Sequence, residues 1–185
     1  MNKPINRLDV SGAALAVVDI QERLVPAMFE RERLVRKAVQ LIRGCSLLNI
    51  PTVATEQYPK GIGPTIKEVA SAIPTFAPME KLDFSSCGAP AFVPALRTLN
   101  ASSVILCGIE AHVCVTQTCL DLLRDGFQVF VASDATSSRS PEDWRAGIER
   151  MRSAGAVTVS VEMALFELLK TSGRPEFKGM LGIVK

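Results

Sequence analysis

Short apolar runs alternate along the chain with longer segments in which apolar residues recur every three or four positions. We expect strands at the short runs, which are residues 14–18, 52–54, 104–107, 128–132 and 157–161. Several of these runs are apolar on both faces, as strands of a buried parallel sheet are. The longer segments have the periodicity of amphipathic helices and lie at residues 32–48, 113–125 and 163–171. Another helix is expected to begin at Pro141, with Ser140 as its N-cap, and to end at Gly155.

This alternation of strands and helices predicts an α/β fold. We expect a three-layer α/β/α sandwich with a mostly parallel, Rossmann-like sheet of about six strands, formed by residues 1–185 as a single domain. Residues 56–91 interrupt the alternation and are rich in proline and glycine. They are predicted to be mostly loop, with a short helix near residues 65–72. Long loops in compact domains are usually functional, so this segment is expected near the site.

Composition narrows the function classes. The chain has 185 residues, 48% hydrophobic and 22% charged, which is ordinary for a globular protein. A net charge of +2 gives no reason to expect nucleic acid or a membrane as a partner. The five cysteines are odd in number and include no Cys-x-x-Cys pair, which favours a reducing, cytoplasmic location. Residues 1–11 are polar and do not resemble a signal peptide.

Asp19 is the first candidate for chemistry. It follows five apolar residues at the carboxyl end of the first predicted strand. Ligands of open parallel sheets bind at the carboxyl ends of the strands, so this carboxylate is expected to face the crevice. The alternative is that Asp19 caps a helix over residues 21–29. The sequence alone leaves these two interpretations open.

Cys114 is the second candidate. It lies where the strand at residues 104–107 turns through Gly108 into a helix, and a helix N-terminus lowers the pKa of a thiol. The alternative is a small buried apolar residue, the commonest environment of a free cysteine. Helical phase favours the functional interpretation, because Cys114 aligns with Thr118 and Asp121 rather than with the apolar stripe. Cys45, Cys107 and Cys119 are expected to be structural, and Cys87 to lie in a loop.

Three residues could act on that thiol. Asp19, a carboxylate at the end of another predicted strand, is geometrically better placed for this than the histidine. His112, the single histidine, stands two positions before Cys114, and such residues do not face each other on a helix. We therefore expect His112 to line the pocket or to be hydrogen-bonded elsewhere. Lys81 could favour the thiolate through its charge, which with the helix N-terminus would make Cys114 the most reactive thiol. Taken alone, Lys81 would be a solvated surface lysine.

No cofactor is expected. No Gly-x-Gly-x-x-Gly follows a predicted strand, so the sequence lacks the motif of a dinucleotide site. The chain has one histidine and neither a His-x-x-x-His nor an Asp-x-His pair, which argues against a zinc or other transition-metal site. The expected ligand is therefore a small-molecule substrate alone.

Four segments together resemble the isochorismatase-like, or cysteine hydrolase, superfamily. They are Val-Val-Asp-Ile-Gln at 17–21, Glu-Lys at 80–81, the run from Cys107 to Val115, and the run from Val131 to Arg139. The resemblance implies a catalytic triad of Asp19, Lys81 and Cys114. It also implies a cis peptide bond at Ile109–Glu110, and an assembly that is a dimer or higher homo-oligomer. The apolar run at residues 163–169 also suggests oligomerisation.

The chain departs from two branches of that superfamily. Nicotinamidases carry an Asp-x-His metal motif after the second strand, where this chain has Gln57. Isochorismatases lack the nucleophilic cysteine that this chain has at position 114. The segments around Tyr58 and Cys114 look most like the isochorismatase domain-containing proteins, a subgroup without a settled substrate.

The implied reaction is hydrolysis of a small amide or ureide through a thioester on Cys114. Backbone N–H groups of Glu110 and Cys114 would form the oxyanion hole, and the pocket would be lined by Gln57, Tyr58, Phe84, Glu110 and His112. The alternatives are a vinyl-ether type of hydrolase on the same fold, or a protein that has lost catalysis and only binds.

Overall fold

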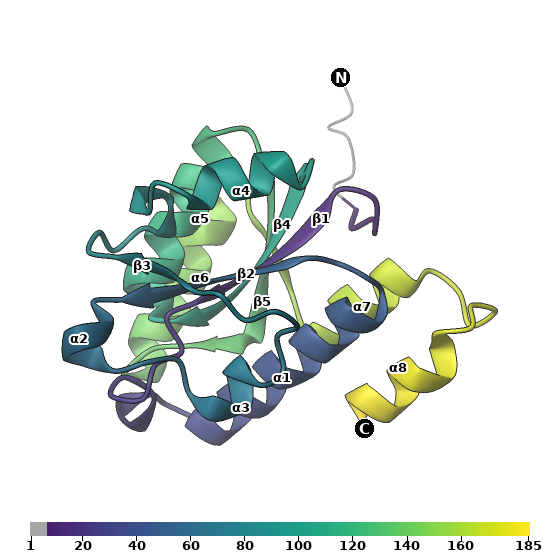
Figure 1. Ribbon diagram of the computed structural model, residues 1–185, viewed down its shortest axis with the longest axis horizontal. Helices are drawn as coiled ribbons and strands as arrows, with labels where there is room; N and C mark the ends of the chain where they lie inside the picture. The colour runs from purple at the N-terminus through teal and green to yellow at the C-terminus, as the bar shows by residue number, and fades with distance from the viewer. Residues whose placement is uncertain (1–6) are drawn as a thin grey trace.

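The computed structural model describes residues 7–185 and is built around a six-stranded sheet in which every strand pair is parallel (Figure 1). The strand order is β3-β2-β1-β4-β5-β6. The strands are β1 (Ala13–Val18), β2 (Thr52–Gln57), β3 (Met79–Lys81), β4 (Ser103–Ile109), β5 (Gln128–Ser137) and β6 (Val157–Val159). The predicted α/β class is confirmed, with a sheet that is wholly rather than mostly parallel.

Helices cover both faces of this sheet, as the predicted three layers require. One face packs against α1 (Arg31–Leu47), α3 (Lys67–Ala70), α7 (Val161–Leu169) and α8 (Phe177–Val184). The other face packs against α4 (Phe92–Thr98), α5 (Thr116–Arg124) and α6 (Pro141–Ser153). Alternate residues of β1 serve the two layers: Leu15 and Val17 face the first, Ala14 and Ala16 the second. The strand is buried on both faces, which explains its unbroken apolar sequence.

Several predicted elements differ in extent from the observed ones. β2 and β5 run on to Gln57 and Ser137, well beyond the apolar runs that predicted them. The strand expected at 157–161 ends at Val159, because Ser160 caps α7 by accepting a hydrogen bond from the Met163 amide. The predicted helix at 113–125 is a π-helical turn, Ala111–Val115, followed by α5.

Residues 56–91 hold more structure than the predicted loop and short helix. They contain α2 (Pro59–Ile62), α3, the edge strand β3, and a 3-10 turn at Ser86–Gly88. β3 pairs Lys81 with Gln57 in register, so this segment is tied to the sheet next to the end of β2. None of the described helices is long and apolar enough to cross a membrane.

The strand order places a topological switch point between β1 and β4. The chain builds outward from β1 through β2 to β3 on one side, then returns to β4 on the other side. Ligands of such sheets bind where the order reverses, at the carboxyl ends of the two central strands. Those ends lie very close together here, since a Cβ on Gly108 would be 2.1 Å from the Val18 carbonyl oxygen. Only glycine, at φ +125°, allows this approach.

Candidate active site

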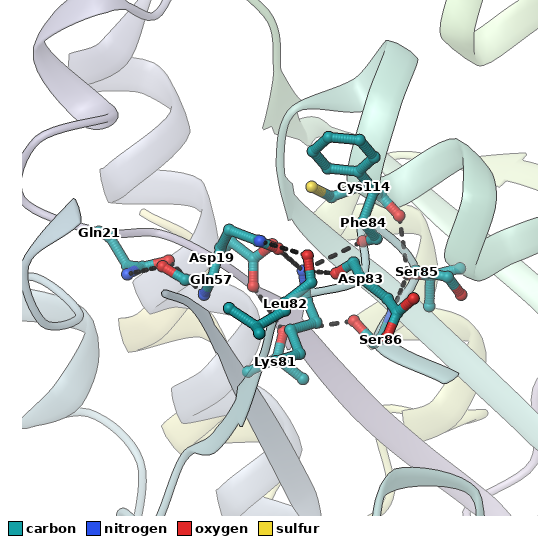
Figure 2. A network of polar contacts seen from close by, with 12 residues as sticks. Asp19, Gln21, Gln57, Lys81, Leu82, Asp83, Phe84, Ser85, Ser86 and Cys114 are labelled. Carbon is teal, nitrogen blue, oxygen red and sulfur yellow. Dashed lines mark hydrogen bonds and ion pairs between the residues drawn. The ribbon is translucent and has the colours of Figure 1, made fainter. Parts of the chain in front are cut away.

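Asp19 lies immediately after β1, at the switch point, and is fully buried. Its Oδ2 accepts a hydrogen bond from Lys81 Nζ at 2.6 Å, and its Oδ1 accepts one from Thr55 Oγ1 at 2.7 Å (Figure 2). The side chain is therefore directed at β2 and β3. The helix-capping alternative is wrong, because residues 21–29 hold only a 3-10 turn at Val25–Ala27, which has no side-chain cap.

Lys81 ends β3, and its side chain is completely enclosed. Its ammonium group lies within hydrogen-bonding distance of four oxygens: Asp19 Oδ2 at 2.6 Å, Gln57 Oε1 at 2.7 Å, and the carbonyls of Phe84 at 3.0 Å and Asp83 at 3.2 Å. The interpretation as a solvated surface lysine is thus wrong. An ammonium has three protons, so these oxygens use its full donor capacity.

Gln57, predicted to line the substrate pocket, binds this lysine. Its Oε1 accepts from Lys81, and its Nε2 donates to the Leu82 carbonyl at 2.7 Å. The amide orientation is determined by these partners, because the flipped amide would set an NH₂ against the ammonium and an oxygen against a carbonyl. Gln21 holds the Gln57 backbone from the other side, accepting from its N–H at 2.7 Å and donating to its carbonyl at 2.9 Å.

Cys114 lies in the π-helical turn that follows β4, and it packs in the apolar layer beneath α5. Only 6% of the residue is exposed, so its side chain is buried more deeply than the helical phase predicted. The turn is pressed against α6, where a Cβ on Gly147 would lie 2.7 Å from the Ala111 carbonyl oxygen. The charge of Asp19 raises the pKa of this thiol, and Lys81 binds the same carboxylate, so the carboxylate has both the ammonium and the thiol as neighbours.

Burial raises the pKa of the Cys114 thiol to about 12. The neighbouring Asp19 charge contributes to this rise, while Lys81 and a backbone hydrogen bond from Glu110 act to lower the pKa of the thiol. The expectation of a depressed thiol pKa is therefore wrong. The helix N-terminus and the lysine do not compensate for the loss of water around the sulfur. The Lys81 ammonium binds the Asp19 carboxylate and not the thiol.

The carboxylate is also displaced from its ordinary titration range. Burial raises the pKa of Asp19, and the charge of Lys81 is the largest influence in the opposite direction. Hydrogen bonds from Lys81, Thr55 and Cys114 also lower it. A carboxylate with a raised pKa is a better proton acceptor than an exposed one, which suits a general base.

The remaining predicted site residues surround this centre at different depths. The Ile109–Glu110 peptide bond is cis, and the Glu110 carboxylate accepts from Arg139 Nε at 2.5 Å and Nη2 at 3.1 Å. His112 is half-buried, with Nδ1 3.0 Å from Ser138 Oγ. Of its two expected roles, lining the pocket or being hydrogen-bonded elsewhere, this contact with the residue that follows β5 supports the second.

Tyr58 and Phe84 are exposed and border two neighbouring cavities. Tyr58 lines a cavity of about 440 Å³ and Phe84 one of about 560 Å³; Leu82 contributes to both. Both cavities are bordered by the segment that supplies carbonyl oxygens to Lys81, and Lys81 itself lines the smaller one, whereas Asp19 and Cys114 line neither.

Three buried hydroxyl residues near the centre were not anticipated: Thr55, Ser86 and Thr118. A weak signal for Thr55 exists in the sequence, because it is a polar residue directly following the apolar core of β2. Thr118 stands on the same predicted helix face as Cys114, whereas Ser86 carries no comparable signal. Within residues 7–185, no three His, Cys, Asp or Glu side chains are gathered as a metal site.

The fold around this centre is that of the isochorismatase-like hydrolases. Residues 13–163 match the Isochorismatase domain, and the chain belongs to that family. It is 37% identical to isochorismatase domain-containing protein 2 of Danio rerio, over 94% of this chain and 87% of the relative. It is also 37% identical to the secreted isochorismatase effector Isc1 of Phytophthora sojae, over 99% and 89%.

Solved structures agree in fold. The MAR1 ribonuclease of Caenorhabditis elegans superposes with a TM-score of 0.91 at 36% identity, over 97% of this chain and 92% of that one. The YcaC gene product of Escherichia coli, described as an octameric hydrolase of unknown specificity, gives 0.92 at 25% identity, over 98% and 91%. Relatives that share this fold are therefore named for different functions. The expectation that nucleic acid is excluded as a partner has no support from them.

Proposed function

We propose that this protein is a cysteine hydrolase that cleaves a small amide or ureide through a thioester on Cys114. The observation that carries the proposal is the buried Asp19 carboxylate, which is hydrogen-bonded to the Lys81 ammonium at 2.6 Å and whose charge raises the pKa of the neighbouring Cys114 thiol. A base in contact with a nucleophile, and itself oriented by a third group, is the arrangement that covalent catalysis requires.

The reaction would begin with transfer of the Cys114 thiol proton to Asp19. The sulfur attacks the carbonyl carbon, and the carbonyl π electrons move to oxygen to form a tetrahedral oxyanion. Backbone N–H groups of Glu110 and Cys114 would stabilise this oxyanion, at about 3 kcal/mol per donor. Asp19 then gives its proton to the leaving amine as the C–N bond breaks, and water, deprotonated by Asp19, hydrolyses the thioester.

Lys81 would serve this cycle as a fixed charge. Its ammonium contacts four oxygens, so it is held in place whether Asp19 is charged or neutral. When the proton moves from the sulfur to the carboxylate, the negative charge moves from Asp19 only as far as the neighbouring sulfur of Cys114. The lysine therefore stabilises both charge distributions, and the proton transfer needs no large reorganisation.

A small substrate fits the surroundings. The Cys114 residue is 6% exposed, and the cavities beside the Lys81 segment are about 440 and 560 Å³, the size of small-molecule pockets. Since the Gln57 amide is used by Lys81 and Leu82, recognition would rest on His112, Tyr58 and Phe84. Nicotinamide should be a poor substrate, because the chain has no Asp-x-His motif to hold a metal.

The deciding experiment is a panel of small amides, carbamoyl compounds and nicotinamide, scored by released ammonia or amine. Cys114→Ala should abolish turnover, while Cys87→Ala, which removes the half-buried thiol of the neighbouring cavity, should leave it intact. Isochorismate and single-stranded RNA belong in the panel, because relatives carry those functional names. Cleavage of either that survives Cys114→Ala, with no amide turned over, would contradict the proposal. Binding without any turnover would favour the alternative of a protein that has lost catalysis.

We further propose a cytoplasmic, cofactor-independent enzyme of one domain that assembles as a homo-oligomer. All five cysteines are free thiols, which supports a reducing location. The octameric relative supports the assembly. Fractionation of cells that express the native gene tests the location, since recovery of the protein outside the cell would contradict it.

A further inference from the structure

The Asp19 carboxylate and the Cys114 turn are connected by a second route that does not pass through Lys81. It consists of the hydroxyl-bearing residues Thr55 of β2, Ser86 of the 3-10 turn and Thr118 of α5. Thr55 is 1% exposed, and Ser86 and Thr118 are fully buried. Three buried hydroxyl residues in one line need mutual partners, because an unsatisfied buried polar group is costly.

The contacts form a continuous chain. Thr55 Oγ1 donates to Asp19 Oδ1 at 2.7 Å, and Ser86 Oγ lies 3.3 Å from Thr55 Oγ1. The Ser86 backbone N–H donates to Thr118 Oγ1 at 2.8 Å. Thr118 Oγ1 in turn donates to the Cys114 carbonyl at 2.7 Å. The chain thus runs from the backbone of the candidate nucleophile to the side chain of the candidate base (Figure 2).

The direction of each hydrogen bond is determined. A threonine hydroxyl has one proton, and that of Thr55 is used on a carboxylate, which can only accept. Ser86 must therefore donate to Thr55. Likewise, the single proton of Thr118 goes to a carbonyl, so its oxygen is free to accept from the Ser86 amide. The donors thus run outward from Ser86 in two arms, through its hydroxyl towards Asp19 and through its amide towards Cys114, and the hydrogen bonds within each arm polarise one another.

We propose that Thr55, Ser86 and Thr118 are positioning residues, whose hydrogen-bond chain holds the Asp19 carboxylate and the Cys114 turn in register. This inference rests on the proposed function, because it takes Asp19 as the base and Cys114 as the nucleophile. Thr55 controls the oxygen of Asp19 that Lys81 does not bind. Ser86 orients Thr55, and Thr118 joins Ser86 to the π-helical turn.

The chain also makes a prediction about charge at Asp19. The titratable groups that face this carboxylate are Lys81 from β3 and Cys114 from the π-helical turn. Thr55 is the neutral donor among its partners, and its hydrogen bond lowers the pKa of Asp19. Removing the hydroxyl should therefore move the titration of Asp19 to higher pH. A merely structural role for Thr55 would not move it.

The first test follows the carboxyl carbon of Asp19 by NMR during a pH titration, in protein labelled at aspartate, with the signal assigned through Asp19→Asn. In Thr55→Val the midpoint should rise by about one pH unit, because a hydrogen bond to a charged acceptor is lost. Thr55→Ser should restore it. Ser86→Ala should raise the midpoint by less, although Ser86 does not bond to Asp19. The matched control is Thr136→Val, a buried strand threonine whose hydroxyl donates to the Ala132 carbonyl at 2.8 Å, and it should change nothing.

The second test measures how fast acrylamide, an amide-bearing electrophile, forms an adduct with Cys114 at neutral pH, by intact mass and peptide mapping. Thr118→Val should slow the adduct about tenfold or more, and Thr118→Ser should not, since only the hydroxyl is needed. Thr136→Val and Thr136→Ser should behave alike. The proposal is overturned if Ser86→Ala leaves the Asp19 midpoint unchanged, or if Thr118→Val and Thr118→Ser react equally fast.

These results are separable from the proposed function. The NMR and adduct measurements need no substrate, so the chain can be supported even if the amide panel shows no turnover. Conversely, amide turnover that depends on Cys114, with no response to Thr55, Ser86 or Thr118, would support the hydrolase and reject the chain.

Discussion

Asp19 binds Lys81 and has Cys114 as a neighbour: the lysine Nζ donates to Asp19 Oδ2 at 2.6 Å, and the charge of the same carboxylate raises the pKa of the thiol. The ammonium also contacts Gln57 and two backbone carbonyls, all oxygens. Within residues 7–185, all the hydrogen bonds of the ammonium therefore go to oxygen atoms and none to the sulfur. The protonation of the thiol depends first on Asp19, the charged neighbour with the larger influence on its pKa. This order predicts opposite effects for substitutions at the two charged residues.

Asp19→Asn should make Cys114 easier to alkylate while it abolishes turnover. The Asp19 charge and hydrogen bond both raise the pKa of the thiol, whereas Lys81 lowers it. Without the carboxylate, the thiol pKa falls, and each unit gives about tenfold more thiolate at pH 8. Iodoacetamide labelling read by peptide mass spectrometry should show Cys114 reacting about tenfold or more faster. Turnover should drop about a hundredfold or more for loss of the base.

Asp121→Asn is the matched control for that experiment. Burial raises the pKa of Cys87 to about 11 with a contribution from the Asp121 charge, whereas Asp121 does not influence the pKa of Cys114. The control should therefore accelerate labelling of Cys87 alone. Slower alkylation of Cys114 in Asp19→Asn would show that the carboxylate promotes the resting thiolate, contrary to the geometry.

Lys81→Met should have the opposite effect on the thiol. Removing the ammonium raises the pKa of both Cys114 and Asp19, since Lys81 lowers each of them. The thiol is then more fully protonated, and Asp19 is more often neutral and unable to accept a proton. We expect alkylation of Cys114 to slow by about tenfold and turnover to fall by about a hundredfold. Lys60→Met, an exposed lysine on the same cavity, should change neither rate.

The sequence was informative where burial produces a pattern. The runs that predicted β1 and β4 are buried at every position, so the strands and the switch-point location of Asp19 followed from them. β3 was not assigned, because three residues at a sheet edge, with Glu80 exposed, leave no apolar run. Its assignment needs the tertiary pairing with β2.

The site was only partly predictable for a related reason. Asp19 and Cys114 are singled out by their places after strands, and Lys81 by family resemblance. The direction of the Cys114 pKa was mispredicted, because desolvation and the Asp19 charge depend on packing. The hydroxyl chain could not be predicted at all, since Thr55, Ser86 and Thr118 come from three distant segments of a chain with many serines and threonines.

The protein should function without a tightly bound metal. The chain has one histidine, His112, whose Nδ1 lies at Ser138. Gln57 stands where a nicotinamidase would have its first metal ligand, and its amide oxygen is occupied by Lys81. Elemental analysis of protein purified without chelator should find well under one zinc, iron or manganese per chain. A full equivalent of metal, lost together with activity on chelation, would refute this.

Ser140→Ala should destabilise the protein by about 1 kcal/mol, the usual effect of losing an N-cap. Ser140 Oγ accepts from the Asp143 amide at 3.1 Å at the start of α6, the helix that supports the π-helical turn. For a chain of this size the melting temperature should fall by about 2–4 °C in a thermal scan. Ser140→Asp retains a capping oxygen and should lose much less. An unchanged melting temperature in Ser140→Ala would mean that water replaces the cap.

The homo-oligomer should form through apolar residues at the cavities, not through α7 as the sequence suggested. Leu165, Leu168 and Leu169 of α7 are buried within the chain, packed with α1 and α8, so the ground for an α7 interface is removed. Leu82 is 75% exposed and Phe84 55%, and both border the cavity beside the candidate site. Exposed apolar groups of this size commonly mark an interface.

Light scattering at micromolar concentration should therefore return a mass that is a multiple of 20.0 kDa, in line with closed symmetric assembly. The double variant Leu82→Ser, Phe84→Ser should shift the mass toward the single chain. Met163→Ser, which replaces an exposed apolar residue on α7, should leave it unchanged. A mass of one chain in the unmodified protein would refute the assembly. An intact oligomer in the double variant would instead place the interface elsewhere, because exposed leucine and phenylalanine side chains at a contact cannot be exchanged for serine without loss of buried apolar area.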